Sequence, residues 1–141
     1  MLQSTLYTTS ATATGGREGR VTSQDGKLDT VLSTPAELGG AGGEGTNPEQ
    51  MFAAGYAACF LSAMKFIAMQ QKTTLPADAT VTATVGIGPR EDAGFGLDVG
   101  LKVTLPGMDK TAAEALIATA HATCPYSHAT RGNLEITPEL A

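Results

Sequence analysis

The two cysteines of this sequence, Cys59 and Cys124, are its strongest candidates for chemistry. A cysteine that loses its proton is a nucleophile and a metal ligand, so a pair of cysteines is redox-active, metal-bound or merely structural. Cys59 lies in the apolar stretch GYAACFLSAMKF, residues 55–66, where a free thiol often serves only as a small hydrophobic side chain. Neither cysteine belongs to a Cys-x-x-Cys motif, so a thioredoxin-type site is not indicated. Residue types and spacing leave the three alternatives open.

Two histidines bracket the second cysteine. His121 lies one helical turn before Cys124, and His128 follows after Pro125. A zinc site needs three or four converging protein ligands, and Cys59 would have to be the fourth. This arrangement matches no recognised ligand spacing, and a histidine near a helix C-terminus is favoured by the helix dipole in any case. We therefore expect no bound metal.

A glycine-rich loop, GAGGEG at residues 40–45, formally matches G-x-G-x-x-G. A dinucleotide-binding fingerprint follows a strand directly and has an acidic residue about twenty positions later. Here Glu44 would repel a pyrophosphate, and Lys65 stands where the acidic residue belongs. We expect a conformationally special loop before a helix and no nucleotide cofactor.

Length and charge limit the class of protein. A chain of 141 residues can bury one hydrophobic core, and we expect a single domain over residues 1–141. The net charge is −5, and the nine lysines and arginines are scattered. Because proteins that bind nucleic acids present basic patches to the phosphates, we expect no nucleic-acid partner.

The sequence also bears on location. Residues 1–14 lack the basic and apolar segments of a secretory signal, and two cysteines are too few for a secreted disulfide scaffold. The longest apolar run, residues 51–69, is interrupted by Ser62 and Lys65 and has no basic flank. Such a run is more typical of a buried helix than of a membrane span. We expect a cytoplasmic protein that does not cross a membrane.

The first part of the chain predicts β-structure. Residues 6–14 are rich in threonine and partly alternating, and residues 20–23 and 27–33 flank the pair Asp25-Gly26. Asp-Gly between two such runs is typical of a tight hairpin turn. We expect two of these strands to form a hairpin.

A helix start follows the glycine-rich loop, in the segment Asn47-Pro48-Glu49-Gln50. Asparagine can cap a helix, proline fits its first position, and glutamate favours the positive end of the dipole. Gln50 completes the spacing of a capping box. We expect the helix to end near Gln71.

The second part of the chain predicts a strand hairpin and then a helix. Residues 80–88 and 95–105 alternate between apolar and polar side chains, as half-buried strands do. A helix is expected over residues 109–123, with Thr111 and Glu114 at capping-box spacing. Its predicted inward stripe is Ala112, Ala115, Leu116, Thr119 and Ala120.

Pro125 cannot continue that helix, so we expect Cys124 at its C-terminal edge, and a short strand over residues 133–137 to close the chain. The order of the elements, with hairpin connections, predicts an α+β fold with a mainly antiparallel sheet and two main helices.

Four stretches carry a resemblance to a known family. They are TATGGREGR (12–20), GGAGGEGTNPEQMFAAGYAACFLSAMKF (39–66), VGIGPREDAGFGLDV (85–99) and AHATCPYSHATRGN (120–133). Together and in this order they resemble the organic hydroperoxide resistance family, which belongs to the wider Ohr/OsmC superfamily. One departure is His128, where the family commonly has asparagine.

The resemblance implies a thiol-dependent peroxidase that reduces alkyl, aryl and fatty-acid hydroperoxides, folded as an intertwined α+β homodimer. Cys59 would be the peroxidatic cysteine and Cys124 the resolving one, with Arg17 and Glu49 as polar partners of Cys59. The reductant would be dihydrolipoamide or a lipoylated protein, and no metal or other cofactor is required. The alternatives are an OsmC-type peroxidase of different substrate preference, a non-enzymatic metal- or ligand-binding dimer, and an inert structural dimer.

The chemistry implied for Cys59 requires a thiolate. A free cysteine has a pKa of about 8.5, and apolar surroundings raise it. Arg17 could supply the cation, since guanidinium stays protonated and its planar fork can hold a thiolate and a carboxylate together; Glu49 would orient it. We expect an apolar substrate pocket lined by Phe52, Tyr56, Phe60, Met64 and Tyr126.

Helix geometry constrains this arrangement. Glu49 and Cys59 are separated by ten positions, so on one straight helix they lie roughly 15 Å apart along the axis. A glutamate side chain cannot span that distance. Either the helix is broken, or Arg17 and Glu49 come from the partner subunit of a dimer, and we favour the second hypothesis.

Overall fold

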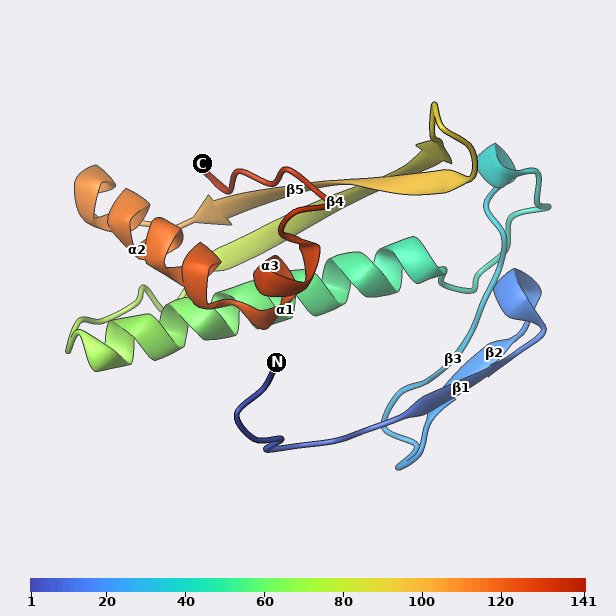
Figure 1. The fold of residues 1–141 in the computed structure, drawn as a ribbon, viewed down its shortest axis with the longest axis horizontal. Helices are drawn as coiled ribbons and strands as arrows, with labels where there is room; N and C mark the ends of the chain where they lie inside the picture. Colours follow the sequence, from blue (N-terminus) through green and yellow to red (C-terminus); the bar gives the residue numbers. More distant parts are fainter. The chain divides into compact units, whose positions relative to one another are not determined.

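The computed structural model describes residues 1–141, which divide into two compact units, residues 1–48 and 49–141. Three strands come first, followed by a long helix, two strands, two helices and a final short strand (Figure 1). This element content confirms the α+β class predicted from the sequence.

The first unit is built on a three-stranded antiparallel sheet in the order β1-β2-β3. Its strands are β1 (Ala11–Thr14), β2 (Arg20–Ser23) and β3 (Asp29–Val31). Gly26 in the turn between β2 and β3 has a φ of 74°, which glycine adopts without steric cost; the predicted hairpin is confirmed. The outer strands are shorter than predicted, because only residues 11–14 and 29–31 pair with β2.

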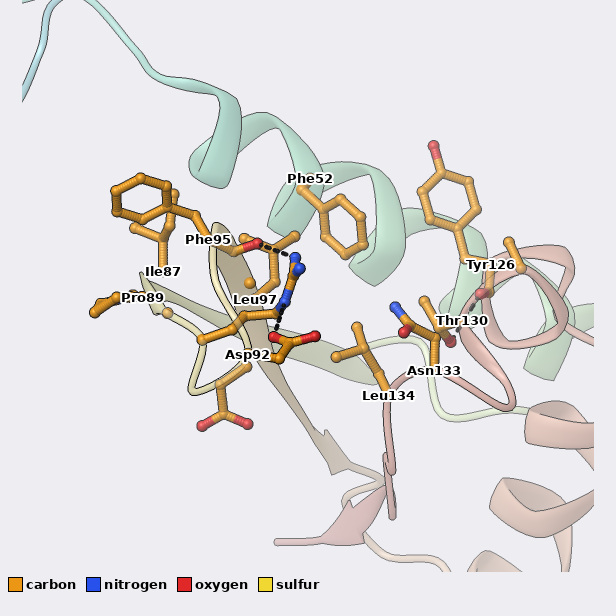
Figure 2. A pocket seen from close by; sticks show the side chains of 16 residues that line it. Phe52, Ile87, Pro89, Asp92, Phe95, Leu97, Tyr126, Thr130, Asn133 and Leu134 are labelled. Atoms are coloured by element: carbon orange, nitrogen blue, oxygen red, sulfur yellow. Dashed lines mark hydrogen bonds and ion pairs between the residues drawn. The ribbon is translucent and has the colours of Figure 1, made fainter.

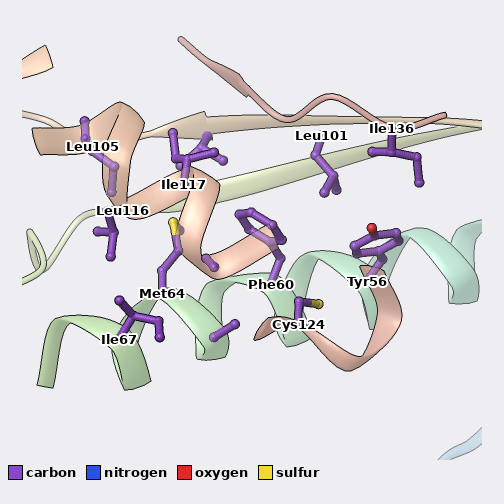
Figure 3. Packing of buried hydrophobic residues seen from close by; sticks show 14 of the residues in the cluster. Tyr56, Phe60, Met64, Ile67, Leu101, Leu105, Leu116, Ile117, Cys124 and Ile136 are labelled. Atoms are coloured by element: carbon purple, nitrogen blue, oxygen red, sulfur yellow. The ribbon is translucent and has the colours of Figure 1, made fainter. Parts of the chain in front are cut away.

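The long helix α1 (Pro48–Gln70) begins at the predicted proline and ends one residue before the predicted end. By length and composition α1 could cross a membrane, a test that the core helix of a soluble protein also passes. Tyr56, Phe60 and Met64 recur every fourth position and are fully buried. Because residues four apart share one helix face, they point together toward the sheet (Figure 3).

The sheet of the second unit consists of β4 (Thr80–Pro89), β5 (Phe95–Thr104) and β6 (Glu139–Leu140). β4 and β5 form the predicted antiparallel hairpin, whereas β6 pairs with β5 in parallel. The strand predicted over residues 133–137 is wrong. Leu134 and Ile136 alternate because they pack against the core from an irregular segment, not because they join a ladder.

The helix α2 (Lys110–Thr123) is capped by Asp109, whose carboxylate accepts a hydrogen bond from the Ala112 N–H at 3.1 Å. The predicted capping box of Thr111 and Glu114 is therefore wrong, since an acceptor two residues earlier starts the helix. The buried stripe also differs from the prediction: Leu116 and Ala120 are correct, but the other members are Ala113 and Ile117 in place of Ala112, Ala115 and Thr119. The observed stripe lies one position later in the sequence than the predicted one and so includes the large Ile117 side chain.

A third helix, α3 (Pro125–Thr130), was not predicted. Pro125 does end α2, as expected, but it also occupies the first position of α3, where its fixed φ is pre-organised and its missing N–H is not needed. Cys124 therefore lies at the corner between two helices.

One hydrophobic core joins the elements of the second unit. β5 contributes Val99, Leu101 and Val103 from alternating positions, and α1 and α2 cover them with their buried stripes (Figure 3). This core holds the middle of α1 and the end of α2 in fixed positions, which places the two cysteines.

Candidate active site

The structure brings Cys59 and Cys124 together. Their Sγ atoms lie 3.8 Å apart, and both thiols are free. Cys59 is half-buried near the middle of α1, whereas Cys124 is fully buried. A disulfide requires an S–S distance of about 2.05 Å, so a shift of less than 2 Å would allow these two sulfurs to bond.

The corner before Pro125 orients Cys124. Its backbone N–H donates to the Ala120 carbonyl at 2.7 Å and so completes α2, while its extended ψ of 125° turns the chain away. Its carbonyl then accepts from the His128 N–H at 3.0 Å in α3. The His128 side chain, at the one departure from the family pattern, is exposed.

The surroundings of Cys59 within its own unit disfavour a thiolate. Burial raises the pKa of the Cys59 thiol, and the neighbouring Cys124 raises it further. A hydrogen bond from the Tyr126 backbone N–H lowers the pKa but does not reverse the shift. Because the thiolate is the reactive form, a peroxidatic Cys59 needs a cation in addition to these groups.

An aromatic cluster adjoins the cysteines. The ring of Phe52 meets those of Tyr56 and Tyr126 edge-on, with centroids 6.3 and 6.4 Å away. Tyr56 and Tyr126 are 5.7 Å apart. Edge-on aromatic packing of this kind is favourable beyond the area that it buries, and it fixes the side chains next to Cys59.

A cavity of about 1220 Å³ opens beside this cluster. Phe52 and Tyr126 form part of its wall, and the β4–β5 hairpin contributes Ile87, Phe95 and Leu97 (Figure 2). The other three residues expected in a substrate pocket, Tyr56, Phe60 and Met64, are fully buried in the core and do not line this cavity. Their direct contact with a substrate stays a prediction.

Arg17 lies in a short 3-10 turn, Gly16–Glu18, between β1 and β2. The turn is entered through Gly15 and Gly16, whose φ angles are 70° and 57°, values that side chains with a Cβ rarely adopt. A Cβ on Gly19, just after the turn, would lie 1.7 Å from the Thr14 carbonyl oxygen. Glycines thus shape the loop that presents Arg17.

Glu49 lies in the first turn of α1, which continues unbroken through Cys59 to Gln70. The broken-helix alternative is therefore excluded. Glu49 and Cys59 of one chain are ten positions apart in the sequence and therefore roughly 15 Å apart along the helix axis.

Sequence reasoning missed a buried polar chain beside the cysteines. The Tyr56 hydroxyl lies 2.8 Å from Ser127 Oγ, which in turn lies 2.9 Å from His121 Nδ1. His121 was considered only as a metal ligand or a dipole partner, and no group of three or more His, Cys, Asp or Glu side chains is placed to hold a metal. These hydrogen bonds depend on α3, which carries Ser127. Because α3 was not predicted, no signal in the sequence indicated that the three side chains meet.

Comparison with known proteins shows the family of this chain. Residues 40–139 match the model of the OsmC-like protein family. An organic hydroperoxide resistance protein of Xanthomonas axonopodis pv. citri is 59% identical over 136 residues, which cover 96% of this chain and 95% of the relative. This chain belongs to the organic hydroperoxide resistance family of OsmC-like proteins.

Solved structures of this family share the fold. The organic hydroperoxide resistance protein OhrB of Bacillus subtilis is 43% identical, with a TM-score of 0.88 over 97% of this chain and all of that one. A Legionella pneumophila protein described as an organic hydroperoxide resistance protein OsmC is 48% identical, with a TM-score of 0.92 over 98% of this chain and 99% of that one. The predicted family and its α+β fold are confirmed.

Proposed function

We propose that this member of the family is a thiol-dependent peroxidase that reduces organic hydroperoxides to alcohols. The observation that carries the proposal is the 3.8 Å separation of the Cys59 and Cys124 sulfurs, in a chain whose relatives are named for organic hydroperoxide resistance. A half-buried thiol next to a fully buried one suits a cysteine that meets substrate and a cysteine that resolves the product.

The proposed cycle balances without a metal or other cofactor. The Cys59 thiolate attacks one peroxide oxygen, the O–O bond breaks, and the departing alkoxide takes up a proton to become an alcohol. Cys59 is left as a sulfenic acid. The Cys124 sulfur then attacks the Cys59 sulfur, and the sulfenic hydroxyl leaves with the Cys124 proton as water. An external dithiol reopens the disulfide by exchange and is itself oxidised.

The proposal requires a cation beside Cys59, because burial and Cys124 raise the pKa of its thiol. Arg17 would supply that charge, and Glu49 would hold the guanidinium in a two-point ion pair. Since Glu49 lies roughly 15 Å along the unbroken α1 from Cys59 of its own chain, Arg17 and Glu49 would act on Cys59 of the partner in an intertwined homodimer.

The substrate would be an alkyl, aryl or fatty-acid hydroperoxide. The cavity beside the aromatic cluster, which neither cysteine lines, has an aromatic and aliphatic part of its wall that includes Phe52, Phe95, Leu97 and Tyr126, and removing apolar surface from water contributes about 25 cal/mol per Å². Hydrogen peroxide has no such surface to bury. An OsmC-type peroxidase with another substrate preference is the second candidate, and comparing rates with hydrogen peroxide separates the two.

The proposed reductant is a lipoyl dithiol, and we propose neither a nucleic-acid nor a membrane partner; the cytoplasmic location stays a prediction. The decisive experiment follows hydroperoxide loss with dihydrolipoamide, thioredoxin or glutathione as the only reductant. We expect sustained turnover with dihydrolipoamide alone. Thiol counting before and after one equivalent of hydroperoxide is the matching control: two thiols lost per chain support the peroxidase, and none lost indicates a binding or structural dimer.

A further inference from the structure

The polar chain formed by Tyr56, Ser127 and His121 crosses three helices. Tyr56 lies on α1, Ser127 on α3 and His121 in the last turn of α2. Tyr56 and Ser127 are both fully buried, and their oxygens are 2.8 Å apart. Buried hydroxyls that find partners stabilise one arrangement of the elements that carry them, so this chain holds the three helices in register.

The positions of the three residues relative to the cysteines are regular. Tyr56 precedes Cys59 by three residues on α1, His121 precedes Cys124 by three, and Ser127 follows Cys124 by three. Through His121, Ser127 links α3 to α2, the two helices that flank Cys124. Through Tyr56, it also links them to the turn of α1 that precedes Cys59. The position of Cys124 is therefore fixed, because the helices on both sides of it are held by these hydrogen bonds.

We propose that Tyr56, Ser127 and His121 act as positioning residues that hold the Cys124 sulfur against Cys59 for disulfide formation. This inference rests on the proposed function, because the step that these residues would assist is part of the proposed peroxidase cycle. In that step the S–S bond forms, the S–O bond of the Cys59 sulfenic acid breaks, and the hydroxyl leaves as water with the Cys124 proton.

The direction of the hydrogen bonds follows from His121. The Ile136 backbone raises the pKa of the His121 ring, as a carbonyl that accepts from the ring N–H does, and a neutral imidazole has one N–H to give. Nδ1 is then the acceptor, Ser127 donates to it, and Tyr56 donates to Ser127. Burial, followed by the charge of Arg131, lowers the pKa of His121, which favours the neutral ring that this order needs.

The test separates the two chemical steps in a single turnover of the reduced full-length protein. With one equivalent of cumene hydroperoxide, peroxide loss reports Cys59 oxidation, and rapid alkylation with mass spectrometry reports the disulfide. We expect Ser127→Ala to leave peroxide loss unchanged and to slow disulfide formation about tenfold, because small displacements of reacting groups cost one to two orders of magnitude in rate. Thr123→Ala is the matched control, since it removes an exposed hydroxyl beside Cys124.

A second pair of variants distinguishes positioning from general packing. His121→Asn keeps an acceptor near Nδ1, whereas His121→Ala removes it. We expect disulfide formation in His121→Asn to be several-fold faster than in His121→Ala, on the same proximity grounds. This comparison also decides the matter should Ser127→Ala fail to fold.

Diamide provides an arm that does not depend on peroxidase activity. It oxidises a pair of thiols to a disulfide and is reduced to the corresponding hydrazine, so it tests the approach of the two sulfurs directly. Slower disulfide formation in Ser127→Ala with diamide supports the positioning role. If the wild type consumes no hydroperoxide, that result refutes only the proposed peroxidase function and leaves the positioning role standing. The inference would be overturned if Ser127→Ala formed the disulfide as fast as the wild type with both oxidants. It would also be overturned if His121→Asn and His121→Ala formed the disulfide at equal rates.

Discussion

The sulfur atoms of Cys59 and Cys124 lie 3.8 Å apart although 65 positions separate the two residues in the chain. One sulfur is half-buried on α1 and the other fully buried at the α2–α3 corner. Their closeness is a product of packing, since the shared core presses both α1 and α2 against β5.

Replacing Cys59 with serine should abolish hydroperoxide consumption, because a hydroxyl at this position is far less nucleophilic than a thiolate. The measurement is peroxide remaining after incubation with protein and dihydrolipoamide. The fold should be unaffected, so the thermal unfolding curve serves as control. Retention of wild-type consumption by Cys59→Ser would rule out the peroxidase proposal.

Replacing Cys124 with serine should permit one turnover and then stop. Without a resolving thiol, the Cys59 sulfenic acid persists and is open to further oxidation. Mass spectrometry after excess hydroperoxide should find sulfinic acid on Cys59 in the variant and a disulfide in the wild type. A variant that keeps turning over with a dithiol and accumulates no oxidised Cys59 would show that Cys124 is not needed for resolution.

Subunit mixing tests whether Arg17 and Cys59 act across a dimer. Cys59→Ser and Arg17→Ala should each be inactive alone, the second because the pKa of Cys59 rises without the guanidinium. In a mixed dimer, one of the two sites would combine the intact Cys59 of one chain with the intact Arg17 of the other. We expect activity to return after unfolding and refolding the variants together, whereas a site contained in one chain predicts no recovery.

Truncating Leu116 to alanine tests the core that places the cysteines. Leu116 is 3% exposed on α2 and packs in the main hydrophobic cluster. Loss of a buried leucine side chain typically lowers the free energy of unfolding by about 2–5 kcal/mol. Urea denaturation should detect a loss of that size, while Thr119→Ala, on the exposed face of the same helix, should change little.

His121 predicts a pH dependence of stability. Burial and the charge of Arg131 lower its pKa below the ordinary value of 6.5, so the unfolded chain binds the proton more readily than the folded one. Stability from this source is complete above about pH 6.5 and is lost as the pH falls toward the lowered folded-state value. The urea midpoint should therefore drop more between about pH 7 and pH 5 in the wild type than in His121→Asn. Parallel pH profiles for the two proteins would contradict this.

Much of the fold could be predicted from local signals. Asp25-Gly26 indicates its hairpin, Pro48 indicates the start of α1, and the alternation of residues 80–88 and 95–105 indicates β4 and β5. These features depend on backbone preferences and on side-chain periods of 2 and 3.6 residues, which are properties of neighbouring residues. The family could be recognised for a related reason, since each stretch that carries the resemblance is a continuous run of the sequence.

Predictions from local signals were wrong or missing where contacts between residues far apart in the chain determine the structure. Residues 133–137 alternate like a strand, but the ladder partner of β5 is Glu139–Leu140; the stripe of α2 follows Ile117 because β5 and α1 offer it a buried place. Likewise the sequence supplies Tyr56, Ser127 and His121 without a pattern, and only the crossing of three helices makes them partners. The sequence by itself determined most of the elements and the reactive residue types. Only the tertiary structure decided which thiols and hydroxyls meet, because contacts between residues far apart in the chain are set by the packing of a common core and not by any local preference.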